Sequence, residues 1–251
     1  MTRRFIMSGH SHWAGIKHKK GANDAARGKI FQKMFKEIYV AATTAGGPDP
    51  DMNPALKLAI AKAKSKNMPK ANIERALAKA KGDGKDASAY TEVLFNATIA
   101  GGATFLVVAL TDNMNRTTSS MKAHFNRQNA ALGKTGQVPF AFDHKGVLEV
   151  SKNLVGEDDL TMVALENGAE DFEVTEDSYI ITTAPENFSK CKSAVESNLN
   201  ISDFMQCEVT YIPNTTVAFD KEKSEKLQEF IARLEDDDDV QEVFHNIEFE
   251  E

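Results

Sequence analysis

The chain has 251 residues, of which 41% are hydrophobic and 27% are charged, a balance typical of globular proteins with more than one packed domain. No apolar run approaches the roughly 18 residues that a membrane-spanning helix needs, and the opening residues lack the apolar stretch of a signal peptide. We therefore expect a cytoplasmic protein of two or three domains with no membrane partner. Cys191 and Cys207 are sixteen positions apart, which fits neither a CxxC redox pair nor a structural zinc pattern, so we expect free thiols.

Charge is distributed very unevenly along the chain. Residues 1–85 hold 18 lysines and arginines against 6 acidic residues, a net charge of +12, whereas residues 86–251 hold 12 against 31, a net charge of −19. Because electrostatic screening acts over about 8 Å at physiological salt, a polyanion near the basic end would experience mainly the local positive charge. This pattern favours a nucleic-acid partner. The alternative is that the basic end docks on the acidic remainder of its own chain.

The first predicted helix covers residues 29–42, where apolar residues recur at three- and four-residue spacing and indicate one buried face. Three lysines lie within roughly 60° of one another on the opposite face. We call Lys29, Lys33 and Lys36 the lysine stripe. A row of lysines is usually a solvated face, but no acidic residue lies within this one, so it is also a candidate phosphate-binding surface.

Two further helices are predicted from their start and stop signals. Asn53 offers an N-cap followed by proline, residues 67–69 form a second stop and restart, and the glycines at positions 82 and 84 end the third helix. The apolar residues expected to pack are Leu56, Ala59, Ile60 and Ala63 in the second helix and Ile73, Ala76, Leu77 and Ala80 in the third. The outward residues are nearly all basic: Lys57, Lys62, Lys64, Lys66, Lys70, Arg75 and Lys79.

Beyond residue 82 the pattern changes to short β-type runs. Residues 93–99 and 103–110 predict a hairpin, and residues 115–128 predict a helix with Met121 and Phe125 facing inward. Residues 144–212 then give the order strand, helix, strand, strand, helix, strand, which is the ferredoxin-like arrangement.

The tail adds a strand at 216–219, a helix at 224–234 and a strand at 243–249, which we expect to complete the sheet that begins at residue 93. The sequence therefore predicts an α+β fold: a three-helix N-terminal domain followed by two α+β, ferredoxin-like domains, the third inserted into the second. The expected boundaries are residues 1–82 for the basic helical domain, 83–137 with 213–251 for the discontinuous domain, and 138–212 for the inserted one.

The opening segment carries the densest functional signal. It combines lysines with Trp13 and with His10, His12 and His18. Cations neutralise phosphates while aromatic and imidazole rings stack on exposed bases, so the segment suits a nucleic-acid strand. Alternatively, Trp13 anchors a basic arm to its own domain. The three histidines also suggest a metal-dependent nuclease, but neither enough acidic residues nor any cysteine lies nearby to complete a ligand set.

Two further polar clusters have both a structural and a functional interpretation. Residues 236–239 are four aspartates that lack the glycine and terminal glutamate of an EF-hand loop, so we expect a solvated turn between a helix and a strand. The cluster at 111–117 either caps the following helix through Asn115 or presents Asn113 and Arg116 to a partner. The chain has no nucleophile-elbow, P-loop or dinucleotide-binding motif, so we expect no enzymatic activity, no cofactor and no small-molecule substrate.

Motifs along nearly the whole chain resemble those of the YebC family, which includes the mitochondrial translational activator of cytochrome oxidase subunit I. The opening motifs are the most specific: GHSxW from Gly9, IKHxK from Ile16 and RGKIF from Arg27. The likeness continues at residues 53–54, 61–64, 67–70, 72–75, 110–113, 115–117, 142–143, 145–147 and 234–240.

This resemblance implies a helical N-terminal domain with two α+β domains, and a role either as a translation factor on the ribosome or as a transcriptional regulator. His12 and Gly15 stand where the family commonly has lysine and asparagine, which removes one permanent cation. Residues 99–102 replace a loop richer in glycine and proline. The family start aligns near Ser8, which suggests Met7 as the initiator.

We therefore expect a non-enzymatic, nucleic-acid-binding regulator of gene expression that is monomeric when free. The favoured partner is ribosomal RNA near the peptidyl-transferase region, and help with consecutive prolines is implied by the resemblance alone. The alternative is a regulator that binds duplex DNA, although no recognition helix with base-reading side chains is evident. If about six cations meet phosphates, log affinity should fall against log salt with a slope of roughly −4 to −5. The candidate contacts are His10, Trp13, Lys17, His18, Lys19, Lys20, Arg27, Lys29, Lys33, Lys36, Lys64, Lys66 and Lys70.

Overall fold

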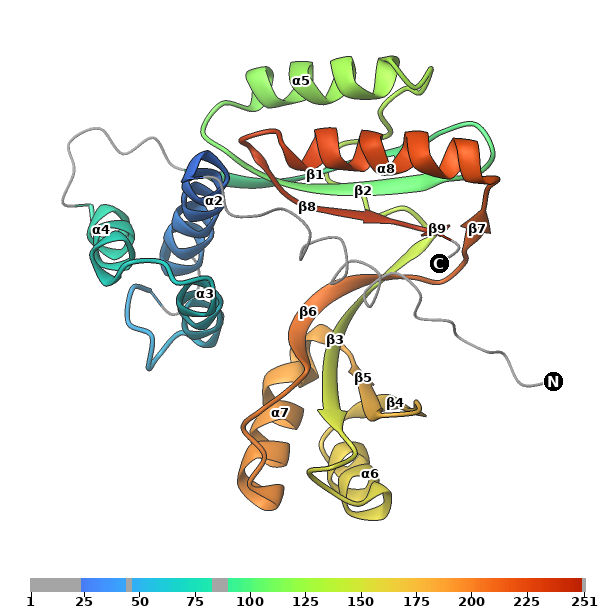
Figure 1. Cartoon of the computed structure of the whole chain (residues 1–251). Helices are drawn as coiled ribbons and strands as arrows, with labels where there is room; N and C mark the ends of the chain where they lie inside the picture. The colour runs from blue at the N-terminus through green and yellow to red at the C-terminus, as the bar shows by residue number, and fades with distance from the viewer. Residues whose placement is uncertain (1–23, 44–46, 83–89, 250–251) are drawn as a thin grey trace. The chain divides into compact units, whose positions relative to one another are not determined.

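The computed structural model describes residues 24–43, 47–82 and 90–249, with side chains from residue 28 onward (Figure 1). The chain forms two compact units. Unit 1 consists of Met1–Ala141 with Thr215–Glu251, and unit 2 of Phe142–Asn214. Unit 2 is therefore one uninterrupted segment inserted into unit 1, and the fold belongs to the α+β class, as the sequence predicts.

The first part of unit 1 contains the three predicted helices, α2 (Asp24–Thr43), α3 (Pro54–Ser65) and α4 (Lys70–Ala80). The predicted start of α3 is confirmed: the side chain of Asn53 accepts a hydrogen bond from the backbone N–H of Leu56 at 3.0 Å. The same side chain donates to the carbonyls of Ala41 and Gly47. Asn53 thus joins the end of α2 to the start of α3.

The predicted apolar faces of these helices form one core. Ile38 from α2, Leu56 and Ala63 from α3, and Ile73 and Ala76 from α4 are all buried in it. Alanines at these contacts let the helices approach closely because they add almost no bulk between the backbones. The basic residues of α3 and α4 consequently point away from this core.

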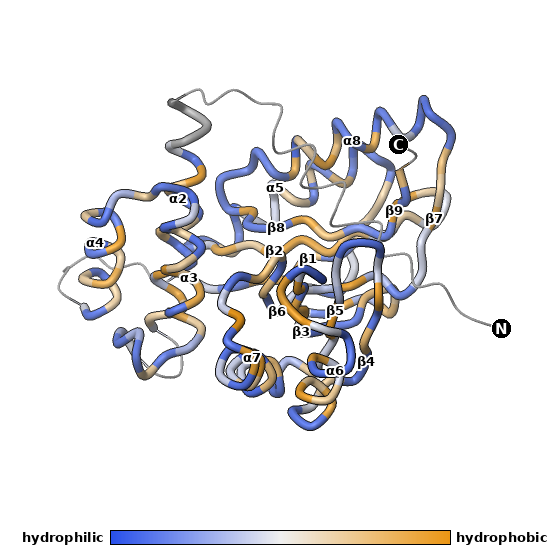
Figure 2. The backbone as a smooth tube through the Cα atoms, turned by 60° about the horizontal axis from the view of Figure 1, so that its bottom comes forward, coloured by the Kyte–Doolittle hydropathy of each residue, from blue (hydrophilic) through white to orange (hydrophobic). Residues whose placement is uncertain are grey.

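The second part of unit 1 is a three-stranded antiparallel sheet in the order β1-β2-β8, with α5 and α8 on one face (Figure 1). The elements are β1 (Thr91–Thr98), β2 (Thr104–Thr111), α5 (Met114–Asn126), α8 (Lys221–Glu235) and β8 (Val240–His245). Hydrophobic and hydrophilic stretches alternate along α8, as expected for a helix with one buried side (Figure 2). Phe105, Phe125 and Phe230 meet edge to face, with ring centroids 5.3 to 5.9 Å apart, and bind both helices to the sheet.

The tail differs from the prediction in one respect. Only β8 joins the sheet with β1 and β2, whereas β7 (Val217–Ala218) and β9 (Ile247–Glu248) pair with each other in parallel. Asn246 separates β8 from β9 because its side chain turns inward, accepting from the backbone N–H of Thr104 at 2.8 Å. This buried contact interrupts the strand that the sequence predicts as continuous from 243 to 249.

Unit 2 is a four-stranded antiparallel sheet in the order β4-β5-β3-β6, against which α6 and α7 pack side by side (Figure 1). Its elements are β3 (Phe142–Ser151), α6 (Glu157–Glu166), β4 (Ala169–Val174), β5 (Ser178–Thr183), α7 (Pro185–Leu199) and β6 (Gln206–Pro213). The predicted ferredoxin-like order is confirmed. Gly146 permits the close approach of α7, since a Cβ there would lie 2.6 Å from the ring of Phe188.

Both cysteines belong to unit 2 and are free, as predicted. Cys191 is fully buried in α7, and burial raises the pKa of its thiol. Burial also raises the pKa of the Cys207 thiol, to about 11. Both groups therefore remain protonated at neutral pH, which makes them poor nucleophiles. Among the described residues, no helix is long and apolar enough to cross a membrane.

Candidate nucleic-acid interface

Part of the predicted site lies outside the described residues. Arg27 belongs to α2, but its side chain is among those that the structure leaves undescribed. The other candidate contacts in this category are His10, Trp13, Lys17, His18, Lys19 and Lys20. The predicted site can therefore be followed in space only from Lys29 onward.

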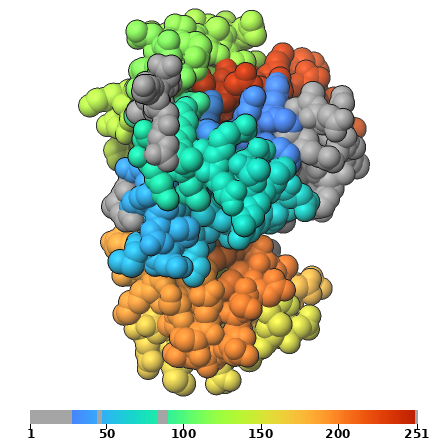
Figure 3. All heavy atoms as spheres, turned by 90° about the vertical axis from the view of Figure 1, so that its left-hand side faces the viewer, coloured from blue at the N-terminus to red at the C-terminus, as the bar shows by residue number. Residues whose placement is uncertain are grey.

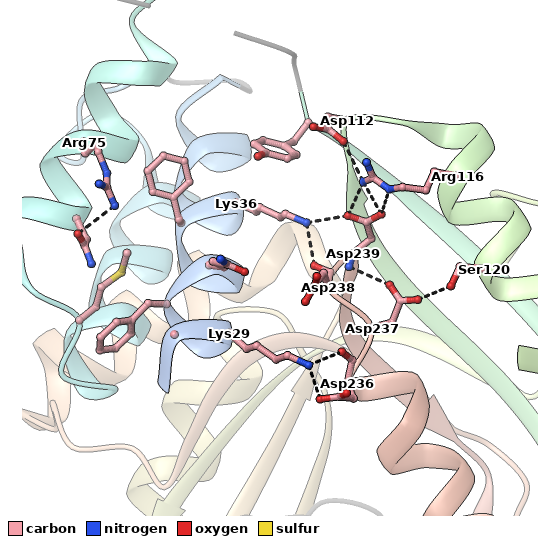
Figure 4. Close-up of a pocket in the computed structure, with 17 residues that line it drawn as sticks. Lys29, Lys36, Arg75, Asp112, Arg116, Ser120, Asp236, Asp237, Asp238 and Asp239 are labelled. Carbon is pink, nitrogen blue, oxygen red and sulfur yellow. Dashed lines mark hydrogen bonds and ion pairs between the residues drawn. The ribbon is translucent and has the colours of Figure 1, made fainter. Parts of the chain in front are cut away.

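Two members of the lysine stripe, Lys29 and Lys36, contact the loop at residues 236–239, which we call the acidic loop (Figure 4). Lys29 Nζ lies 2.7 Å from a carboxylate oxygen of Asp236. Lys33 donates to the carbonyl of Glu235, the last residue of α8, at 2.7 Å. Lys36 lies 2.9 Å from a carboxylate oxygen of Asp239. The stripe is thus directed at anionic groups of the same chain, which is the alternative left open by the sequence.

The three lysines occupy different electrostatic environments. The hydrogen bond to Asp236 raises the pKa of Lys29. Burial lowers the pKa of Lys33, whose ammonium group donates to a carbonyl rather than to a carboxylate. The acidic loop also follows the C-terminus of α8, where unsatisfied carbonyls carry partial negative charge. Helix end and aspartates together present a dense array of oxygen acceptors to α2.

Asp239 is the centre of a buried polar network, and the prediction that residues 236–239 form a solvated turn is wrong at this position. Its side chain is only 6% exposed. Arg116 Nη2 lies 2.7 Å from one carboxylate oxygen, and the hydroxyl of Thr117 donates to the same oxygen at 2.7 Å. Burial by itself would raise the pKa of Asp239, but the hydrogen bonds from Lys36 and these two neighbours outweigh it and lower that pKa.

The neighbouring polar cluster at 111–117 is also resolved by this network. Asn113, and not Asn115, caps α5, because its side chain accepts from the backbone N–H of Arg116 at 3.1 Å. Arg116 lies against Asp239 and against Asp112, 3.0 Å away, while 54% of its side chain is in solvent, so its presentation to a partner stays a prediction. The spacing of residues 113 and 116 is that of an N-cap and its third helical position, so the cap was recoverable from sequence. The pairing with Asp239 was not.

One more lysine of the helical part is paired internally. Lys62 on α3 lies 3.2 Å from Glu37 of α2 and 2.9 Å from Glu242 of β8. Burial alone would lower the pKa of Lys62, but the two carboxylates outweigh it and raise that pKa. This ion-pair bridge connects α2, α3 and the sheet of unit 1.

The remaining candidates lie on an exposed surface around the turn between α3 and α4. We call Lys64, Lys66 and Lys70 the cation patch; all three are exposed. Within the described part of the chain, Lys64 and Lys66 form no ion pair, and Lys70 lies 3.5 Å from Glu74 with both side chains in solvent. The space-filling view shows α3 and α4, in cyan to teal, at the surface (Figure 3). The three ammonium groups of the patch are therefore accessible to solvent.

An open cleft of about 1030 Å³ lies between α2, α4 and the acidic loop (Figure 4). Its basic lining residues are Lys29, Lys36, Arg75 and Arg116, and its acidic ones are Asp112 and Asp236 to Asp239. Arg75 covers the ring of Phe35 at 5.7 Å, which adds an apolar floor. Opposite charges thus face each other across the cleft.

Comparison with known proteins gives one consistent result. The TACO1/YebC protein N-terminal domain matches residues 11–83, and the TACO1/YebC second and third domain matches residues 90–247. The chain is 73% identical to a probable transcriptional regulatory protein of Mycoplasmopsis agalactiae, over 98% of this chain and 100% of that protein. It is 47% identical to a protein of the same description from Geobacillus sp., over 96% of this chain and 98% of that protein.

A solved structure agrees with this result. A conserved hypothetical protein from Aquifex aeolicus has 41% sequence identity and a TM-score of 0.76, with 96% of this chain and 98% of that chain covered. The motifs that resemble the YebC family thus extend to matches over almost the full length. The chain belongs to the TACO1/YebC family.

Proposed function

We propose that the protein is a non-enzymatic, nucleic-acid-binding regulator of gene expression that holds phosphate backbone with its N-terminal helical part. The observation that carries this proposal is the cation patch, three exposed lysines around the turn between α3 and α4. The patch belongs to residues 1–85, whose net charge is +12. Such a cluster attracts polyanions and releases their counterions on binding. The names of the relatives, which describe regulatory proteins and not enzymes, agree with this role.

The favoured target is structured ribosomal RNA, where the protein would act in the cytoplasm as a translation factor, including at proline-rich sequences. The resemblance to the YebC family motivates this choice. The surface of α4 supports it, because Ala71 and Ala78 are exposed beside Lys70 without a hydrogen-bonding side chain, Glu74 faces Lys70, and the exposed Arg75 lies over the ring of Phe35 and donates to Asn72. Contacts to phosphate and to RNA shape suit such a surface better than sequence readout.

The second candidate is a transcriptional regulator that binds duplex DNA, and the printed names of the relatives favour it. The two targets can be separated by competition at physiological salt between ribosomal RNA and promoter fragments. Preference for a defined promoter over ribosomal RNA would reverse the ranking.

The backbone-binding mechanism is tested by Lys64→Gln, Lys66→Gln and Lys70→Gln in one variant. Each lost phosphate contact flattens the plot of log affinity against log salt by about 0.7 to 0.9, so we expect a change of about 2 to 3 in slope. The matched control neutralises three other exposed lysines of unit 1: Lys122, Lys134 and Lys221. Equal slopes for the two variants would show that net charge, and not this surface, determines binding.

A further inference from the structure

We propose that the acidic loop and the C-terminal end of α8 that precedes it form an internal competitor of nucleic acid, which occupies Lys29 and Lys33 in the free protein and yields them to phosphates on binding, while Lys36 stays in place. The inference rests on the proposed function and describes the regulation of the same interface. It explains why a lysine stripe with no acidic residue within it is directed at five consecutive acidic residues, 235–239.

The oxygen atoms that meet the stripe resemble those of a phosphate backbone. Lys29 contacts both a carboxylate oxygen and the carbonyl oxygen of Asp236, at 2.7 and 3.2 Å. Lys33 contacts the carbonyl of Glu235, and Lys36 that of Asp238 at 2.8 Å. A row of acceptors with net negative charge satisfies ammonium groups in the way that successive phosphates do.

The contacts are graded along α2, which determines which lysines can exchange. The outer pair is exposed, with 43% of the Lys29 side chain and 72% of the Asp236 side chain in solvent. Exposed pairs are weak because water and salt screen them. The inner pair is different: Lys36 is 12% exposed and Asp239 is also held by Arg116. Separation therefore begins at Lys29 and stops before Lys36.

Lys33 favours exchange because its ammonium group has no carboxylate among the described residues as a hydrogen-bond partner in the free protein. Its ammonium group is desolvated against the carbonyl of Glu235, and its lowered pKa reflects this burial. The carboxylates of Glu235, Asp237 and Asp236 act on this group without a hydrogen bond to it, whereas a phosphate would place a full negative charge in direct contact with it. Separating Lys33 from the end of α8 therefore costs less free energy than separating an ammonium group from a carboxylate.

The first test is Asp236→Asn, measured by fluorescence anisotropy with a labelled short RNA duplex over a series of potassium chloride concentrations. We expect about a threefold gain in affinity, which corresponds to the loss of one exposed ion pair. The matched control is Glu222→Gln, which makes the same change in net charge at the other end of α8 and removes the exposed Lys226 pair. We expect no gain from it, because α8 is about 20 Å long and screening acts over about 8 Å.

The second test separates competition from a purely structural role. Lys29→Gln breaks the same ion pair as Asp236→Asn, so both variants should shift the thermal unfolding midpoint alike. Under competition they change RNA affinity in opposite directions, and Lys29→Gln with Lys33→Gln abolishes the gain of Asp236→Asn. Equal affinity for Asp236→Asn and Glu222→Gln, or a gain that survives loss of both lysines, would overturn the competition. Salt-dependent RNA binding by the unaltered protein would then still support the proposed function, whereas absence of any binding would overturn both.

Discussion

At the scale of single residues, Asp239 shows how one carboxylate can join the helical part of unit 1 to its α+β part. It accepts from Lys36 of the helical part and from Arg116 and Thr117 of the α+β part. A carboxylate that is 6% exposed is tolerated only when its lone pairs are satisfied, and here they are. Loss of the charge leaves Lys36 and Arg116 without their shared counter-ion.

We therefore expect Asp239→Asn to lower the free energy of unfolding by about 3 kcal/mol at neutral pH, as for other buried pairs that lose one partner. The pKa of Asp239 is lowered in the folded protein. Its stabilisation is fully present above the unfolded-state pKa, about 4, and is lost as pH falls through the folded-state pKa. The difference between the two proteins in denaturant titrations should thus be constant near neutrality and shrink in acid.

The exposed neighbour Asp238 provides the control for this prediction. Its backbone carbonyl accepts from Lys36, but its side chain lies in solvent. Asp238→Asn should change stability by less than about 0.5 kcal/mol at every pH. An equal, pH-dependent loss in both variants would assign the effect to the net charge of the loop and not to the buried network.

At the scale of elements, Asn53 is more than a helix cap. Its side chain is almost completely buried, at 1% exposure, and satisfies three backbone groups from α2, the following turn and α3. An ordinary N-cap contributes about 1 kcal/mol, and each buried backbone group left without a partner adds to the loss.

We expect Asn53→Ala to destabilise the helical part by about 2 to 3 kcal/mol, seen as faster amide hydrogen exchange in α2 and α3. Asn113→Ala is the matched comparison, because Asn113 caps α5 with one hydrogen bond from an exposed position. Asn113→Ala should lower the free energy of unfolding by only about 1 kcal/mol. Similar losses at the two caps would mean that the bonds to Ala41 and Gly47 contribute little.

At the scale of the whole molecule, unit 2 begins and ends on neighbouring strands. Phe142 of β3 pairs directly with Pro213 of β6, so the two points where the chain enters and leaves the unit lie side by side. Insertions with adjacent ends can be removed without stretching the host. Unit 2 also holds 4 lysines against 15 acidic residues, a net charge of −11.

Replacement of residues 142–214 by a short glycine-containing turn should therefore leave unit 1 folded, with a cooperative thermal transition. RNA affinity should be retained or increased, because the deletion removes negative charge and none of the cation patch. Loss of the transition on deletion would show that unit 1 depends on the inserted unit for its stability. The domain limits predicted at residues 82, 137 and 212 stay predictions until such truncations are made.

Local patterns in the sequence determined the elements of this protein. Helical periodicity placed the buried faces at Leu56, Ala63 and Ile73, and the order of strands and helices gave the ferredoxin-like unit, because both signals depend on residues close together in the chain. The interruption at Asn246 was missed since its cause, a hydrogen bond to Thr104, spans 142 positions.

Charge composition likewise showed that the N-terminal part of the chain is strongly basic, but it did not determine which anions the basic side chains contact. Only the tertiary structure directs Lys29 at Asp236, 207 positions away, and leaves Lys64 and Lys66 open to solvent. Coulomb attraction does not distinguish a phosphate from a carboxylate of the same chain. The choice between them is made by the path of the backbone, which brings the end of α8 to the basic face of α2.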